Sequence, residues 1–409
     1  MRETQNSCFV GLDIGTSSVR CVVGMIDPNS NGKLSLIGHG SAKNSGMRKG
    51  MVVHVDDVAE AIVRAVTEAE RISGQQIHHA TVNVNGSHVM GFNSKGVIAI
   101  SAANREITPE DRMRVEEAAT VVSLPANREI IQFFAKNYSL DGQHNIKDPV
   151  GMQGIRLEVD AHIVTAATPN LRNLSQALNK AEIGVTNYTV SSLAAAEAVL
   201  SRQQKEAGTL LLDIGAGTTN MIVVEDGEVQ HVAVIPVGGI NLTNDLAIGL
   251  KTDLDVAERV KLEHASLTGD SKKAKVSVKV GGKTHTFDYE EVYMVTEARI
   301  DELLDYVDKE LVKIRRSRKL PGGIVLTGGT AQLPGMVEFT RDKLQLATRL
   351  GSIHNMSGLV DTVEGTSYCT AVGLMILDML LPPDPTYQGS SQPTLNNLAD
   401  KLLKRFRKG

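Results

Sequence analysis

The sequence predicts an α/β fold of two related lobes, interrupted by a smaller inserted unit and followed by a separate C-terminal helix. Three observations lead to this prediction. The tetrapeptide Leu-Asp-Ile-Gly occurs at 12–15 and again at 212–215, and the same series of short strands follows each copy. A segment of different texture, at about 85–162, lies between the copies. Residues 395–409 are basic and amphipathic.

The first lobe is predicted from the pattern around the first copy. Residues 8–41 alternate between apolar runs and turn clusters, which indicates three short strands. Residues 56–72 carry apolar side chains at helical spacing, and Asp56 is a suitable N-cap. We assign 1–84 to this lobe and expect 163–190 and 360–381 to complete it.

The inserted segment 85–162 is expected to form a small α/β subdomain. An apolar run predicts a strand at 97–101, and two more strands are predicted before residue 168. A helix is predicted over 108–124, because Thr108 can cap it and Pro109 suits its first position.

The second lobe is assigned to 191–359. It begins with a predicted helix from Ser191 to about Gly208, and the second copy of the tetrapeptide follows this helix. Its outer subdomain is placed at about 228–300 and contains a β-hairpin that turns at Gly281-Gly282. The "GGKT" run at this turn is not a phosphate loop, because Ser277 stands where that motif requires glycine.

Composition excludes several classes of protein. The 409-residue chain has a net charge of −4 and three cysteines, an odd number without metal spacing, so no disulfide framework is expected. Neither a signal peptide nor a long apolar span is predicted. Aromatic residues make up 3% of the chain and form no stripe with basic residues, so we expect no nucleic-acid partner.

The repeated tetrapeptide is typical of a phosphate site. Each copy ends a strand and turns through glycine and hydroxyl residues, which can present N–H and O–H groups to an anion. The candidate phosphate-binding residues are Gly15, Thr16, Ser17 and Ser18 in the first copy and Gly215, Gly217, Thr218 and Thr219 in the second. Asp13 and Asp213 would repel a bare polyphosphate, so we expect them to hold Mg²⁺, through water. One copy alone would be read as an ordinary hairpin; two copies with the same plan favour the phosphate site.

A third element follows at 322–339, where a buried-looking strand runs into Gly328, Gly329 and Thr330. The glycine pair leaves room for a flat ligand against the backbone. Taken alone, this element is equally compatible with a plain strand–turn–helix connection.

The C-terminal segment predicts a membrane-binding helix. Residues 382–394 are rich in Pro, Ser and Gly and read as a flexible linker. On a helical projection of 395–409 the apolar and basic residues separate, which is typical of a helix that lies in a bilayer interface among anionic lipids. The apolar residues are Leu395, Leu398, Leu402, Leu403 and Phe406, and the basic residues are Lys401, Lys404, Arg405, Arg407 and Lys408. The alternatives are a helix docked on its own domain and a partner-binding helix, and the linker argues against tight docking.

Together these motifs resemble the actin/Hsp70/sugar-kinase superfamily, whose members bind a nucleotide between two related lobes. The resemblance implies an actin-like ATPase fold that binds ATP or ADP. It also implies contacts with ribose and adenine at positions that match the family's motifs. These are Gly238, Gly239, Asn241, Glu258 and Lys261, with Gly328, Gly329 and Thr330 at the adenosine.

Within the superfamily the chain resembles the FtsA cell-division family, on the run 46–62, the subdomain that opens near 82–91 and the basic C-terminus. This resemblance implies a peripheral protein at midcell, on the cytoplasmic side of the bacterial inner membrane. It implies filaments with 85–162 as one contact, and later divisome membrane proteins as partners. It also implies that the tail of the tubulin-like protein FtsZ binds the outer part of the second lobe, where Arg299 is a candidate contact.

The resemblance implies slow hydrolysis at most. Related ATPases position the attacking water with a Glu that matches Ser191 here, and Glu197, farther along the helix, is expected to point elsewhere. No catalytic residue is assigned. The alternatives are a small-molecule kinase, which needs a carboxylate base over its acceptor, and a pilus-assembly protein that resembles this family.

Overall fold

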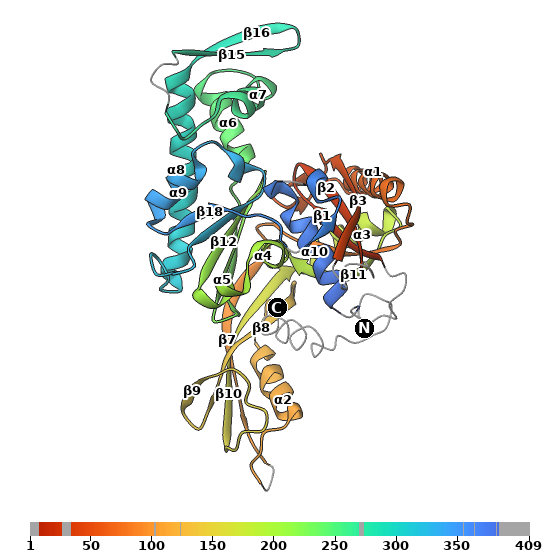
Figure 1. The fold of residues 1–409 in the computed structure, drawn as a ribbon, viewed down its shortest axis with the longest axis vertical. Helices are drawn as coiled ribbons and strands as arrows, with labels where there is room; N and C mark the ends of the chain where they lie inside the picture. Colours follow the sequence, from red (N-terminus) through yellow and green to blue (C-terminus); the bar gives the residue numbers. More distant parts are fainter. Residues whose placement is uncertain are drawn as a thin grey trace.

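The computed structural model describes residues 8–26, 34–101, 104–122, 124–269, 274–354, 356–363, 365–381 and 383. The amphipathic segment 395–409, and the linker 382–394 except for residue 383, lie outside the described residues. The molecule is elongated, with two lobes side by side at its middle, an inserted sheet at one end and the outer part of the second lobe at the other (Figure 1).

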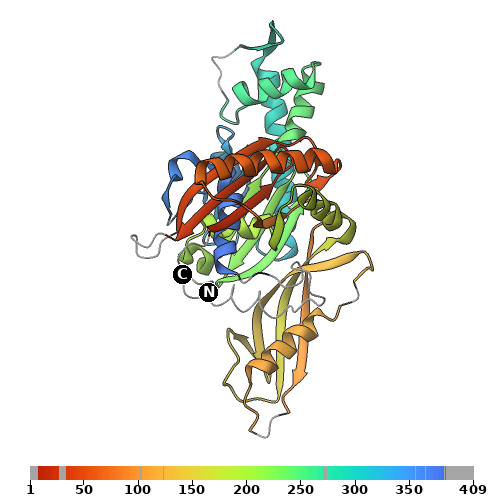
Figure 2. The same cartoon turned by 90° about the vertical axis from the view of Figure 1, so that its right-hand side faces the viewer.

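The first lobe is built on a sheet with the strand order β11-β6-β1-β2-β3-β19. Its strands are β1 (Cys8–Ile14), β2 (Ser18–Ile26), β3 (Leu34–Lys43), β6 (His79–Val84), β11 (Gly184–Val190) and β19 (Ser357–Gly358). The short strands β4 (Met47–Arg48) and β5 (Met51–Val52) pair separately. Helices α1 (Val55–Ser73) and α3 (Thr168–Lys180) pack together, and α1 lies along the sheet (Figure 2).

The second lobe repeats this hairpin plan in a sheet with the order β14-β13-β12-β17-β18. Its strands are β12 (Thr209–Ile214), β13 (Thr219–Glu225), β14 (Glu228–Ile235), β17 (Ile324–Thr327) and β18 (Thr348–Leu350). Helices α8 (Tyr289–Lys313) and α9 (Met336–Leu344) accompany it. In both lobes the first strand has a hairpin partner on one side and a parallel strand on the other, so the repeat is structural.

The outer part of the second lobe has its own apolar core, which includes Leu246, Val260 and Val292. It contains α6 (Gly239–Gly249), α7 (Leu254–His264) and the hairpin of β15 (Lys275–Val280) and β16 (Lys283–Asp288). The predicted hairpin is present, and Gly281 and Gly282 both have positive φ. Because β14 belongs to the main sheet, this part begins at α6 and not at 228.

The inserted subdomain is a four-stranded sheet covered by one helix. Its elements are β7 (Met90–Ala99), α2 (Pro109–Thr120), β8 (Arg128–Leu140), β9 (Gln143–Ile146) and β10 (Arg156–Ala167). Thr108 forms the expected capping box with Asp111. Strand β10 continues past 162, because its residues pair with β8 as far as Ala167. The sheet rests on β14, where the Val232 N–H donates to His162 Nε2 at 3.0 Å.

Two helices connect the lobes and cross closely. They are α4 (Ser191–Val199) and α10 (Cys369–Leu380), preceded by a 3-10 turn η3 (Thr366–Tyr368). Gly373 allows the crossing, since a Cβ there would lie 1.7 Å from the Ala194 carbonyl oxygen. No helix in the described ranges combines the length and apolarity that a bilayer span requires.

Three local predictions were wrong. Helix α1 begins at Val55 after His54, so Asp56 lies in the first turn, where it pairs with Lys180. The helix expected to run to about Gly208 breaks after Val199, because Ser201 caps a separate helix, α5 (Arg202–Ala207). The second lobe ends before 359, because β19 pairs with β3 of the first lobe.

Replacing Gly373 with Ala is expected to lower the free energy of unfolding by about 1 to 3 kcal/mol, because the crossing helices must move apart. Chemical denaturation measures this change. Gly269→Ala is a matched control, since a Cβ there meets only the Tyr293 ring at 3.6 Å. Equal stability of the two variants would contradict the close crossing.

Candidate functional site

A cleft of about 630 Å³ lies between the two lobes. It is lined by the turns of both repeated hairpins, the starts of α4 and α10, and residues of α6 and α7. The predicted site residues along its walls are Asp13, Gly15, Thr16, Ser17, Ser18, Asp213, Gly215, Thr218, Gly239, Glu258, Lys261, Gly328, Gly329 and Thr330. The two copies of the motif therefore open into one cavity, although 200 positions separate them.

The two turns have the same backbone geometry. The Gly15 N–H donates to the Ser18 carbonyl at 3.0 Å, and the Gly215 N–H donates to the Thr218 carbonyl at 2.9 Å. The turns also contact each other, since a Cβ at Gly217 would lie 2.8 Å from Thr16 Oγ1. Gly217 thus serves the close approach of the turns and does not line the cleft itself.

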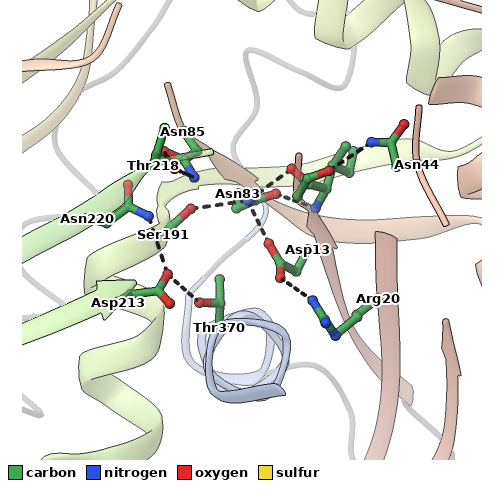
Figure 3. Close-up of polar contacts among 12 residues, drawn as sticks. Asp13, Arg20, Asn44, Asn83, Asn85, Ser191, Asp213, Thr218, Asn220 and Thr370 are labelled. Atoms are coloured by element: carbon green, nitrogen blue, oxygen red, sulfur yellow. Dashed lines mark hydrogen bonds and ion pairs between the residues drawn. The ribbon is translucent and has the colours of Figure 1, made fainter. Parts of the chain in front are cut away.

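Asp13 is buried at the end of β1, where three neighbours act on its carboxylate (Figure 3). Asn83 Nδ2 donates to its Oδ1 at 2.8 Å, and Arg20 Nη1 lies 4.0 Å from its Oδ2. Burial raises the pKa of the Asp13 carboxyl to about 7, the Arg20 guanidinium opposes this rise, and the nearby Asp213 adds to it. The site therefore makes a bare carboxylate costly.

Asp213 occupies the equivalent place at the end of β12. It accepts hydrogen bonds from Asn220 Nδ2 and Thr370 Oγ1, both at 3.3 Å. Burial raises its pKa, while these two hydrogen bonds and Arg20 lower it. A buried carboxylate, Asp13, and a half-buried one, Asp213, face one cavity and fit the oxygen ligands that Mg²⁺ takes. The described residues include no cluster of three or more His, Cys, Asp or Glu side chains able to hold a metal. Such a cation would therefore need water or phosphate oxygens to complete its shell.

The glycine pair after β17, Gly328 and Gly329, packs against the carboxylate of Asp213. Gly328 has φ of 88°, and a Cβ there would lie 2.6 Å from Asp213 Oδ1, so only glycine fits. Nothing lies within 4 Å of a Cβ built on Gly329, so the backbone there opens to the cleft. Thr330 Oγ1 donates to the Gly215 carbonyl at 3.0 Å and ties this element to the second turn. The open strip can accept a flat ligand.

The far wall of the cleft comes from α6 and α7. Lys261 Nζ lies 2.7 Å from Glu258 Oε2 and donates to the Gly239 carbonyl at 3.3 Å, so its charge is held on this wall. Apolar side chains of Ile240, Leu262 and Leu333 lie beside it. A polar strip next to an apolar wall suits a sugar attached to a base.

Besides Gly217, four predicted residues among those described lie outside the cleft lining: Thr219, Gly238, Asn241 and Arg299. Thr219 is buried and donates to the Val237 carbonyl at 2.9 Å. Asn241 accepts from the Gly238 N–H at 3.1 Å, and together they cap α6. Arg299, on α8, pairs with Asp245 and Glu302 in the outer part of the second lobe.

Ser191 lines the cleft at the first position of α4, where its hydroxyl accepts from Asn83 Nδ2 at 3.1 Å. Glu197 points away and forms an ion pair with Lys205 at 2.9 Å. Among the described residues that line the cleft, the carboxylates are Asp13, Asp213, Glu258 and Glu263. Only the first two lie at the phosphate turns, and both fit the cation.

Several cleft residues were not predicted from the sequence. Arg20 and Asn220 face the two aspartates across the hairpins, in the register Asp13↔Arg20 and Asp213↔Asn220. The constant offset of the repeat could have identified both, since opposite residues of an antiparallel pair share a face. Asn85 bridges the lobes by donating to Thr218 Oγ1 at 3.1 Å, and no local pattern marks it.

Comparison with protein families gives two matches. Residues 210–373 match the model described as cell division protein FtsA, and residues 86–165 match the SHS2 domain inserted in FtsA. The chain is 36% identical to cell division protein FtsA of Pseudomonas aeruginosa, over 98% of this chain and 97% of that protein. It is 39% identical to the Bacillus subtilis protein of that name, over 90% and 83% of the two chains.

Solved structures show the same fold at lower identity. A PilM–PilN type IV pilus biogenesis complex matches with a TM-score of 0.65 and 18% identity, over 90% of this chain and 98% of that chain. MreB5 of Spiroplasma citri bound to ADP matches with a TM-score of 0.53 and 15% identity, over 91% and 97%. These neighbours confirm an actin-like fold.

Replacing Asp13 with Asn is expected to stabilise the ligand-free protein by roughly 2 to 4 kcal/mol above pH 7. The pKa of Asp13 is raised to about 7 by folding, so the native state holds a proton that the unfolded chain releases. The carboxylate therefore costs stability as the pH rises from about 4 to 7, and Asn removes this cost.

Urea unfolding of both proteins at pH 8 and pH 5 measures the effect, with the exposed Asp342→Asn as the control. The gain should be larger at pH 8. A loss of stability at both pH values would contradict the described environment of Asp13.

Proposed function

Because the chain belongs to the FtsA family of cell division proteins, we propose that it is an ATP-regulated assembly protein. In this proposal it tethers the FtsZ division ring to the inner face of the cytoplasmic membrane. The observation that carries the proposal is the cleft in which both repeated turns face one another with a desolvated carboxylate behind each, Asp13 buried and Asp213 half-buried.

The cleft supports binding of ATP or ADP with Mg²⁺. Asp13 and Asp213 would hold the cation through water, which supplies the positive charge that a polyphosphate needs beside two carboxylates. The turn N–H and hydroxyl groups would hold the phosphates, and the open backbone at Gly329 would accept the adenosine. The ADP-bound MreB5 neighbour has this fold, which supports a nucleotide as the ligand.

The walls of the cleft support retention of ATP more than its hydrolysis. A general base must reach the attacking water with a free carboxylate or imidazole. Ser191 has neither, and Glu197 does not line the cleft and is paired with Lys205. In this proposal the nucleotide acts as a ligand that favours one assembly state.

The sequence of residues 395–409 supports a membrane anchor. An apolar face flanked by five basic residues fits a helix that inserts at the lipid headgroups, with roughly 1 kcal/mol for each cation near an anionic surface. A helix of this length is marginal alone in water, so it would fold on the membrane. The protein would then be peripheral, at midcell.

The partners follow from the family. The FtsZ C-terminal tail would bind the outer part of the second lobe, where Arg299 stands among Asp245 and Glu302. The inserted subdomain at the opposite end would provide one contact of a filament and reach later divisome membrane proteins (Figure 1). Actin-like neighbours such as the MamK double helical filament, with a TM-score of 0.53 and 13% identity over 92% and 100% of the chains, support self-association.

The unchanged protein is expected to release phosphate from Mg-ATP at less than about one turnover per second. Replacing Ser191 with Glu should raise this rate by about 100-fold, since it places a carboxylate at the cleft wall. Single-turnover phosphate release measures both rates. Ser191→Gln is the control, because Gln has nearly the size of Glu but no charge, and it should not raise the rate. Fast release by the unchanged protein would contradict the retention proposal.

Deletion of 395–409 is expected to abolish flotation with vesicles that contain anionic phospholipid, because the apolar face and the cations are lost together. A full-length variant with Leu402→Asp and Phe406→Asp should also fail to float, while its nucleotide binding stays unchanged. If the deleted protein floats as well as the full chain, the anchor lies elsewhere.

A further inference from the structure

Arg20 breaks the symmetry of the repeated hairpins. It lies on β2 directly opposite Asp13, whereas the same position in the second hairpin holds the neutral Asn220. The Arg20 side chain is 23% exposed and lines the cleft. Figure 3 shows its guanidinium beside Asp13 on the first-lobe wall. One wall of the cleft therefore carries a cation that the other lacks.

The surroundings hold Arg20 loosely. Its Nη1 is 4.0 Å from Asp13 Oδ2, which is longer than a hydrogen bond, so this pair leaves N–H donors for another acceptor. The guanidinium also stands over the Tyr368 ring, 5.4 Å from its centre. A cation–π contact orients the planar group without using its donors. Arg20 is thus positioned without being saturated.

The distribution of charges in the cleft makes Arg20 a candidate to bind a phosphate. Of the described ionisable residues that line it, four are acids and two are cations. Lys261 is held by Glu258 and the Gly239 carbonyl on the α6–α7 wall. Arg20 is the cation on the wall of the phosphate turns. A planar guanidinium can donate two parallel hydrogen bonds to a phosphate.

We propose that Arg20 selects triphosphate over diphosphate by exchanging its partner from Asp13 to the terminal phosphate. This inference rests on the proposed nucleotide site. When Asp13 turns to a bound cation, its negative charge is no longer available to Arg20, and the nearest new acceptor is the phosphate. With the base against the α6–α7 wall of the cleft, the terminal phosphate would be the part of the nucleotide nearest Arg20, and a diphosphate would not reach it.

The test is equilibrium titration of the full chain with fluorescent ATP and ADP analogues in the presence of Mg²⁺. Arg20→Met should weaken ATP binding by about 10- to 100-fold, because one charge-assisted pair is lost. ADP lacks the phosphate of that pair, so its binding should weaken by less than about threefold. Arg20→Lys should recover part of the ATP affinity, because it restores charge without the planar fork. Arg64→Met is a matched control, since Arg64 pairs on the surface with Glu60 at 2.9 Å.

Equal weakening of ATP and ADP by Arg20→Met would overturn the proposal, because a residue that only neutralises Asp13 would affect both alike. An unchanged ATP affinity would overturn it as well. Denaturation of the ligand-free variants shows whether they are folded, and the Lys variant keeps the comparison valid if the Met variant is not. If the unchanged protein binds neither nucleotide, the proposed function fails, and the inference fails with it.

Discussion

Two carboxylates held away from water on opposite walls of one cleft, Asp13 buried and Asp213 half-buried, impose the main physical constraint on this structure. Asp13 and Asp213 each end a central strand, and each is removed from solvent so far that its pKa rises. Neutral side chains donate to both carboxylates, Asn83 to the first and Asn220 and Thr370 to the second, and the Arg20 cation lies beside the first. Such a pair of carboxylates is expected to lower the stability of the empty protein, and a cation bound between the lobes would relieve this cost.

The walls that carry Asp13 and Asp213 are held in place by contacts from α10 and from the start of the inserted subdomain. The start of α10 contributes to both walls, because Tyr368 orients Arg20 and Thr370 donates to Asp213. Both phosphate turns also meet the root of the inserted subdomain. Thr16 accepts from the Gly50 N–H at 3.0 Å, Gly50 packs on Gly86, and the neighbouring Asn85 bonds Thr218. The two repeated turns and the inserted subdomain thus share one support.

Most of the architecture could be predicted from the sequence, because the tetrapeptide repeat and the strand pattern are local signals. The hairpin at Gly281-Gly282 and the cap at Thr108 were found for the same reason. Element ends were less certain: Ser201 interrupts a continuous helical pattern by capping a new helix, which periodicity does not show. The edge strand β19 joins a sheet whose other strands lie far away in the chain, so tertiary pairing alone decides its lobe.

For the candidate site too, residues within local motifs could be predicted from the sequence, and residues placed by contacts between distant segments could not. Most residues of the motifs line the cleft, as Gly329 does, whereas Gly217, Thr219 and Asn241 serve contacts with groups nearby. Arg20 was missed although the register of the repeat contained it, and Asn85 was missed because its partner is 133 positions away. Contacts between lobes leave no trace in spacing.

We propose that two matched turns hold one nucleotide between Asp13 and Asp213. A structure of the full chain with Mg²⁺ and a non-hydrolysable ATP analogue tests this proposal. Phosphates are expected between residues 15–18 and 215–218, with a cation beside Asp13 and Asp213 and the base against α6 and α7. A nucleotide that contacts one turn alone, or lies outside the cleft, would contradict it.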